Sequence, residues 1–299
     1  MTGKLFRSMG TLAAVATATL PMAAAAQELG QPAPGEMGLQ GSASVIMDSI
    51  RAFHDGPLLI VAVGIALLVL ALLLVVIFRF NAKANPTPSK TTHNTMIEVV
   101  WTVVPILILV IIAIPSFSVL TDQLTIPDGQ RKYLGSNIFS FGEVEIPAPG
   151  LTVKATGQQW YWDYEYENGK ALSSNILSDA EALAKGQPRL LAVNYELVVP
   201  VDTTVRLQVT ADPTGVIHAF ALPAFGVKID AVPGKLNETW FNARKTGIYY
   251  GQCSELCGKD HAFMPIAIRV VTKEEYAAWM AAFEAGNIDD ANATLPALT

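Results

Sequence analysis

The sequence has 299 residues, of which 51% are hydrophobic and 15% charged, and its mean hydropathy is +0.36. This composition is too apolar for an ordinary soluble protein, while the second half of the chain is too polar to lie wholly within a membrane. The formal net charge of −6 disfavours nucleic acid as a partner and favours a basic one, and two cysteines exclude a disulfide-dense scaffold.

The N-terminus has the pattern of an exported protein. Residues 1–26 begin with Lys4 and Arg7, continue into an apolar run and close with small alanines, which is typical of a secretory signal peptide. The apolar run is shorter than the roughly 20 residues that a membrane anchor needs. Residues 27–56 are expected to form an N-terminal lead outside the cytoplasm, and the Gly/Pro-rich stretch within it, at residues 30–41, is predicted to be flexible.

Two uncharged apolar runs follow, at residues 57–78 and 99–121. Each is long enough to cross a hydrocarbon core of about 30 Å as a helix, so we predict a transmembrane hairpin over residues 57–121. A buried helical hairpin of a soluble protein is the alternative, which the length and apolarity of the runs disfavour. The loop at residues 79–96 carries basic residues and no acidic one, so the positive-inside rule places it in the cytoplasm.

Glu98 stands one residue before the second run, at its cytoplasmic end. It could be an interfacial carboxylate that the dipole of the helix N-terminus favours. It could also be a carboxylate for proton uptake, because ionisable groups at membrane depth usually face a bundle interior or a water path. The residue alone leaves both interpretations open.

After a connector at residues 122–150, the chain changes to short stretches rich in β-branched and aromatic residues. This texture predicts an all-β sandwich or barrel over residues 151–284, followed by a tail at residues 285–299. A capping box from Thr272 to Glu275 predicts a helix at its end. From residue 151 onward the chain has 12 Lys+Arg and 17 Asp+Glu. The predicted strands are residues 151–157, 160–166, 192–199, 204–210, 216–222, 239–242, 247–251 and 266–271.

One loop concentrates metal-binding side chains: Cys253, Cys257, His261 and Met264. Soft sulfur and imidazole donors with a Met contact favour copper. A disulfide suits an exported protein but leaves His261 and Met264 unexplained, and a tetrahedral zinc site would not use Met. In the third interpretation both thiolates bridge two copper ions, and His261 and the distant His218 each cap one. A lone histidine on an apolar strand is otherwise usually a core residue.

At this point the sequence resembles subunit II of the bacterial and mitochondrial cytochrome c oxidases, from about residue 53 to 284. The resemblance rests on the loop at residues 251–264, on the Gln-Trp-Tyr-Trp run at residues 159–162, and on the Val-Ile-His strand at residues 216–218. The turn at residues 230–234 and the stretch at residues 93–105 also match. Gly215 and Phe220 depart from the family pattern, where an acidic residue and a tryptophan are usual.

The resemblance implies a cupredoxin-type Greek-key fold with a binuclear CuA centre. Its copper ligands would be the side chains of His218, Cys253, Cys257, His261 and Met264, with the backbone carbonyl of Glu255. The Glu255 carboxylate would also hold a magnesium ion shared with the catalytic subunit, with Asp230 nearby in the water network. Trp160 would receive electrons from cytochrome c, and Glu98 would lie at the mouth of a proton channel.

The predicted function is therefore that of subunit II of a respiratory haem-copper oxidase. The chain would lie in a bacterial inner membrane with two spans, with its copper domain and both termini in the periplasm. Its partners would be subunit I, the other oxidase subunits, cytochrome c and lipid. Electrons would pass to haem in the catalytic subunit, where oxygen reduction drives proton translocation, and this chain would hold no oxygen-reducing site.

We further expect reduced cytochrome c to dock near Trp160 by its basic face, helped by Asp163, Glu165 and Glu167. These acids alternate with tyrosines, as on any solvated strand face. A membrane-tethered copper-delivery or thiol protein is the main alternative function. It would show helices alternating with strands, which this sequence lacks before residue 272. A quinol-oxidase-type subunit would lack the copper ligands.

Overall fold

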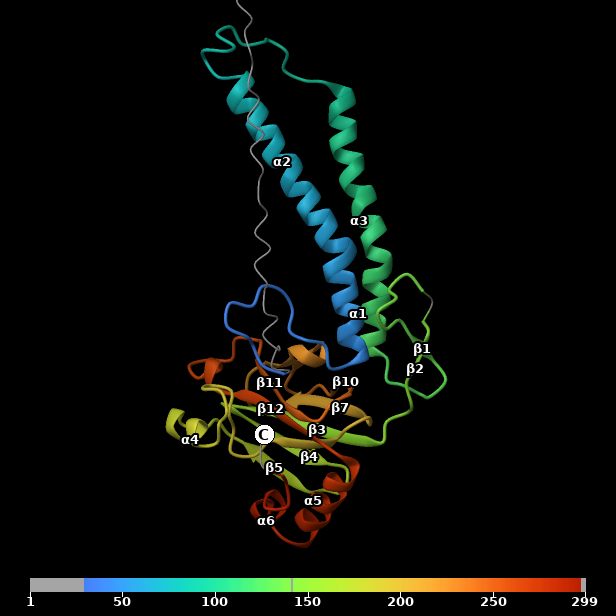
Figure 1. The fold of residues 1–299 in the computed structure, drawn as a ribbon, viewed down its shortest axis with the longest axis vertical. Helices are drawn as coiled ribbons and strands as arrows, with labels where there is room; N and C mark the ends of the chain where they lie inside the picture. The colour runs from blue at the N-terminus through green and yellow to red at the C-terminus, as the bar shows by residue number, and fades with distance from the viewer. Residues whose placement is uncertain (1–29, 141, 297–299) are drawn as a thin grey trace, which may run out of the picture.

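The computed structural model describes residues 30–140 and 142–296, so the predicted signal peptide at residues 1–26 lies outside the described residues. Figure 1 shows two long helices side by side at one end of the molecule and a strand-rich domain at the other. The helical end consists of α1 (Val45–Phe53), the π-helical turn η1 (His54–Leu58), α2 (Leu59–Arg79) and α3 (Thr95–Leu124).

The two helices of the predicted hairpin are confirmed. The continuous segment Val45–Arg79 and the helix Thr95–Leu124 are both long and apolar enough to cross a membrane, with hydropathies of 3.5 and 2.8. The first segment is kinked at Gly56, where φ and ψ leave the helical region. Pro57 follows directly, and its missing N–H and its ring account for the break in the helical hydrogen bonds.

The first helix begins earlier than the apolar run indicated. α1 lies within the N-terminal lead at residues 27–56, after the stretch at residues 30–41 that was predicted to be flexible, and Ser44 caps it by accepting a hydrogen bond from the Met47 amide. Val45 and Ile46 are buried against the strand-rich domain together with Trp240. Tertiary burial of these apolar side chains stabilises a helix too short to be stable alone.

The strand-rich domain contains two five-stranded sheets (Figure 1). Their strand orders are β10-β7-β3-β4-β5 and β6-β12-β11-β8-β9. A two-stranded ribbon, β1 with β2, lies in the connector. The strands are β1 (Lys132–Tyr133), β2 (Val144–Glu145), β3 (Leu151–Gln158), β4 (Tyr161–Tyr166), β5 (Ala171–Ser174), β6 (Leu197–Pro200), β7 (Thr204–Ala211), β8 (His218–Leu222), β9 (Val227–Ala231), β10 (Asn237–Asn242), β11 (Gly247–Cys253) and β12 (Pro265–Val271).

The predicted fold class, a helical hairpin followed by a cupredoxin-like all-β domain, is confirmed. Every predicted stretch overlaps a strand, and β3 alternates buried and half-buried residues as the period-two pattern requires. The strands β1, β2, β5 and β9 and the short helices α4 (Asp179–Ala184) and α6 (Ile288–Asn292) were not predicted. The core between the sheets includes Trp162, Tyr164 and Phe220, which meet edge to face.

The predicted C-terminal helix is α5 (Lys273–Ala285), and both hydrogen bonds of its capping box are present. It buries Trp279 and Phe283 on the core, and the Trp279 indole donates to Asn292 in α6. The described part of the tail therefore packs on the domain. The 3-10 turns η2 (Pro223–Phe225) and η3 (His261–Phe263) complete the fold.

The strand-rich domain is joined to the membrane helices at two places. At the start of α1, the Ser44 hydroxyl donates to the Phe225 carbonyl at 2.7 Å. At the end of α3, the Gln123 amide donates to the Gly226 carbonyl at 2.8 Å, and the Trp240 indole donates to the Asp122 carbonyl at 3.0 Å. Both joints hold the domain against the ends of the helices.

Candidate metal centre

Strand pairing brings the distant histidine to the sulfur-rich loop. His218 begins β8, and β8 pairs antiparallel with β11, so that Cys253 at the end of β11 lies opposite Phe220. The chain then turns through Cys257 and the short helix η3 before β12 returns beside β11. Residues 35 positions apart in the sequence therefore meet where the adjacent strands β8 and β11 begin and end.

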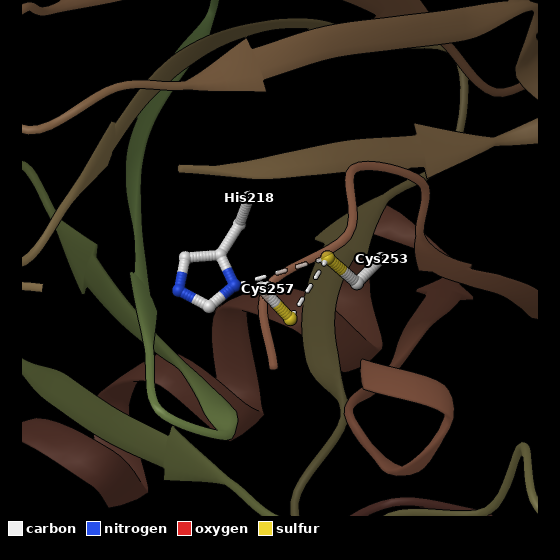
Figure 2. Close-up of side chains that lie close together, drawn as sticks. All are labelled: His218, Cys253 and Cys257. Atoms are coloured by element: carbon white, nitrogen blue, oxygen red, sulfur yellow. Dashed lines mark hydrogen bonds between the residues drawn. The ribbon is translucent and has the colours of Figure 1, made fainter. Parts of the chain in front are cut away.

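Five donor side chains converge at this place. The Cys253 and Cys257 sulfurs are 3.8 Å apart, and His218 Nδ1 lies 3.8 Å from the Cys253 sulfur (Figure 2). His261 Nδ1 and Met264 Sδ each lie 3.5 Å from the Cys257 sulfur. Among the described residues, one group of three or more Cys, His or acidic side chains has this metal-binding geometry, and it consists of His218, Cys253 and Cys257.

Both thiols are free, and their separation far exceeds the roughly 2.05 Å of a disulfide bond. The structure therefore disfavours the disulfide interpretation. The Glu255 carbonyl oxygen accepts a hydrogen bond from the Cys253 thiol at 3.3 Å, whereas the Glu255 side chain is exposed. Two thiols, two imidazoles and a thioether form a soft donor set that fits copper better than zinc.

Burial shifts the pKa of two of these donors, His218 and Cys257. His218, Cys253, Cys257 and Met264 are all at most 4% exposed. Burial lowers the pKa of His218, with a further contribution from nearby His261. Burial, together with the neighbouring Cys253, raises the pKa of Cys257 to about 12. Burial thus favours the neutral imidazole of His218 and the protonated thiol of Cys257, the uncharged forms that a dry environment prefers.

Two tryptophans support the loop from the first sheet. Trp160, in the turn between β3 and β4, donates its indole N–H to the Cys257 carbonyl at 2.9 Å. Trp162 donates to the Met264 carbonyl at 3.3 Å and meets His218 edge to face at 6.0 Å. No sequence signal singled out Trp162, which lies with Tyr164 and Tyr166 on the buried face of β4.

The structure also places a cation on Trp160. Lys259 Nζ lies 5.3 Å from the Trp160 ring centroid, and it forms an ion pair with the adjacent Asp260 at 3.7 Å. Trp160 is therefore half-buried between the backbone of the sulfur-rich loop and a lysine of the same loop. No sequence signal distinguished Lys259, because lysine is not one of the metal-binding residue types that made the loop stand out.

The three predicted docking acids do not form a free patch. The Asp163 carboxylate accepts hydrogen bonds from Gln158 and Ser173, and Glu165 forms an ion pair with Lys154 at 3.2 Å. Glu167 is exposed in the turn after β4. Asp163 and Glu165 are thus engaged by neighbouring side chains, whereas Glu167 is exposed to solvent.

Neither Glu98 nor Asp230 belongs to the group of metal-binding side chains. Glu98 is in the first turn of α3 and accepts a hydrogen bond from the Asn94 amide at 3.1 Å, which is the capping role expected from the helix dipole. It lies at the end of α3 far from the strand-rich domain (Figure 1). Asp230 is exposed on β9 opposite Ala219, one residue from His218.

The fold and site define a membrane-anchored, cupredoxin-like metalloprotein. Residues 151–271 match the family "Cytochrome C oxidase subunit II, periplasmic domain", and residues 32–119 match "Cytochrome C oxidase subunit II, transmembrane domain". The chain therefore belongs to the cytochrome c oxidase subunit II family. This confirms the resemblance, and it makes the chain a subunit of an oxidoreductase complex rather than a copper-delivery or thiol protein.

Individual relatives agree with this assignment. The chain is 45% identical over 253 residues to a probable cytochrome c oxidase subunit 2 of Rickettsia bellii, covering 84% of this chain and 85% of the relative. It is 38% identical over 315 residues to cytochrome c oxidase subunit 2 of Cereibacter sphaeroides, covering 99% and 95%. A crystal structure of the periplasmic domain of subunit II from Bradyrhizobium japonicum is 58% identical, with a TM-score of 0.43, covering 47% of this chain and 97% of that one.

Proposed function

We propose that this subunit holds a binuclear copper centre of the CuA type, accepts single electrons from cytochrome c and passes them to haem in the catalytic subunit. The observation that carries the proposal is the pair of free sulfurs 3.8 Å apart with a histidine Nδ1 facing each of them. When bound, the copper ions supply one-electron redox chemistry. The ligands are His218, Cys253, the Glu255 carbonyl, Cys257, His261 and Met264.

The protein's own contribution is a rigid and dry ligand cage. Cys253 is fixed by β11, His218 by β8, and Met264 by the start of β12, so three adjacent strands of one sheet hold the donors. The Trp160 and Trp162 indoles hold the loop carbonyls from the opposite sheet. Ligands that keep one arrangement in both oxidation states favour fast electron transfer.

Trp160 is the residue through which electrons reach this cage from cytochrome c. Its side chain is part-exposed, and its indole is hydrogen bonded directly to the backbone of the ligand Cys257. The excess of acidic residues after residue 150 favours a basic donor. Asp163, Glu165 and Glu167 contribute to this field, although Glu165 is partly neutralised by Lys154.

The salt dependence of turnover tests the docking proposal. A charged docking surface is screened as the Debye length falls to about 8 Å at physiological ionic strength, so turnover with a basic cytochrome c should fall as salt rises. The measurement is steady-state oxidation of cytochrome c by the purified complex. Indifference to salt would show that docking does not depend on this acidic field.

The remaining assignments extend the same proposal. The exposed Glu255 carboxylate, with Asp230 nearby, is the candidate magnesium ligand at the border with the catalytic subunit. Glu98 lies at the mouth of a proton channel on the cytoplasmic side. The basic loop at residues 79–96 supports an orientation in a bacterial inner membrane with the copper domain and both termini in the periplasm. In this orientation residues 285–299 form a periplasmic tail.

Copper loading of the detergent-solubilised chain tests the central claim. We expect two copper ions per chain, with absorption and EPR spectra in which one unpaired electron is shared over two nuclei. Cys257→Ser should abolish this spectrum because it removes one of the two sulfurs. At most one copper per chain, or an unchanged spectrum in Cys257→Ser, would contradict the binuclear assignment and favour transient metal handling.

A further inference from the structure

Gly157 in β3 lies directly against the ligand His218. Gly157 is in the middle of the first sheet, paired with Trp162 on β4 and Ala211 on β7, whereas His218 begins β8 of the second sheet. A Cβ atom on Gly157 would lie 2.9 Å from His218 Cδ2, 3.0 Å from Cγ and 3.2 Å from Cβ. The two sheets therefore approach at this point as closely as a glycine permits.

The contact is on the opposite edge of the imidazole from the donor nitrogen. Cδ2 and Nδ1 are both bonded to Cγ, so Gly157 faces the Cδ2 edge while Nδ1 faces the Cys253 sulfur at 3.8 Å (Figure 2). Rotating the ring about the Cβ–Cγ bond leaves Cβ and Cγ in place and would not relieve a clash with an added methyl group. The whole side chain would have to move, and the space on its Nδ1 side is occupied by the two sulfurs.

On the side of Nε2, packing rather than hydrogen bonding holds this ring. His218 is fully buried, and its Nε2 has no hydrogen-bond partner among the residues that the structure describes. The Trp162 edge contacts the ring at an interplanar angle of 63°. Metal-binding histidines usually donate their second ring N–H to an acceptor that sets the ring orientation. Here Gly157 and Trp162 take over that task sterically.

We propose that Gly157 is a positioning residue for the copper ligand His218, because its missing side chain lets the imidazole hold Nδ1 toward the two sulfurs. The proposal rests on the copper-binding function proposed above and adds a residue outside the ligand set to it. Gly157 touches neither sulfur nor the electron donor, and acts through His218.

The first test compares Gly157→Ala with Ala155→Ser in the full chain. Ala155 is buried on the same face of β3, about 7 Å along the strand, and also gains one heavy atom. We expect Gly157→Ala to bind fewer than two coppers per chain, or to bind two with an EPR spectrum in which the unpaired electron is no longer shared equally. Ala155→Ser should keep the wild-type copper content and spectrum. A wild-type spectrum in Gly157→Ala, or equal losses in both variants, overturns the proposal.

A second test needs no copper. The melting temperature of the apo-protein is measured for the wild type, Gly157→Ala, His218→Ala and the double variant. If the added methyl group clashes with the imidazole, Gly157→Ala lowers the melting temperature when His218 is present and lowers it less when His218 is alanine. An equal drop in both backgrounds overturns the contact, whether or not the wild type binds a copper pair. The double variant also serves if Gly157→Ala alone does not fold.

Discussion

At the residue scale, the candidate copper ligands and the residues that support them differ in how far the sequence reveals them. Cys253, Cys257, His261 and Met264 are close in sequence, so residue type and spacing were sufficient to predict copper. His218 is 35 positions from Cys253, and elimination among four histidines pointed to it. Gly157 has no chemistry of its own, so its role emerges only when the two sheets are packed together.

Lys259 gives a prediction at this scale. Its ammonium group lies over the Trp160 ring, at the place where a basic donor would dock. Lys259→Met keeps a side chain of similar length but removes the repulsion between this ammonium group and a basic donor. KM for a basic cytochrome c should therefore fall by about threefold at low salt, which is the effect expected of one unit charge near 6 Å in water. The measurement is steady-state turnover of the complex at low and high ionic strength.

The matched control is Lys273→Met, which removes an exposed lysine from α5. It changes the net charge equally but not the charge beside Trp160. If both variants lower KM alike, the overall charge decides the affinity; if Lys259→Met raises KM, the lysine assists docking.

At the element scale, the features that could be predicted were those with local signals. The apolar runs predicted α2 and α3, and the capping box predicted α5. α1 and β9 depend on contacts made elsewhere: α1 packs on Trp240, and β9 pairs with β8. Their own sequences are short and mixed, so tertiary context decides their structure.

The capping box of α5 gives a prediction for stability. Thr272→Ala removes the side chain that accepts from the Glu275 amide, and should lower the free energy of unfolding by about 1 kcal/mol. Ser178→Ala removes the same type of cap from α4, which has six residues and a single buried one. Because less burial depends on α4, its loss should be smaller in thermal unfolding of the apo-protein. A larger loss in Ser178→Ala would contradict this ranking.

At the scale of the whole molecule, the connector at residues 122–150 is more ordered than a linker. The Asp122 carboxylate is buried, forms an ion pair with Arg131 at 2.8 Å and accepts a hydrogen bond from the Leu134 amide at 2.8 Å. Leu134 and Ile138 also pack on Val119 near the end of α3. The β1–β2 ribbon is thus fastened to the base of the membrane helix.

Removing this carboxylate tests the attachment. Asp122→Ala leaves a buried amide and a guanidinium without their acceptor, so it should cost about 1–3 kcal/mol. We expect faster hydrogen exchange in residues 132–145 and an unchanged copper spectrum. Asp179→Ala is the control, because its ion pair with Arg189 is exposed and should contribute about 0–1 kcal/mol. Unchanged exchange in Asp122→Ala would show that apolar packing alone holds the ribbon.

The two joints between helices and sheets also restrict how electrons can be delivered. A domain attached by a single flexible linker can change its orientation and carry its redox centre from one partner to another. This domain is hydrogen bonded to the helices at Ser44 and again at Gln123, and two attachments restrict its rotation relative to the helices. A metal bound in this domain would then stay at a constant height above the lipid, and a diffusing carrier would have to bring each electron to it.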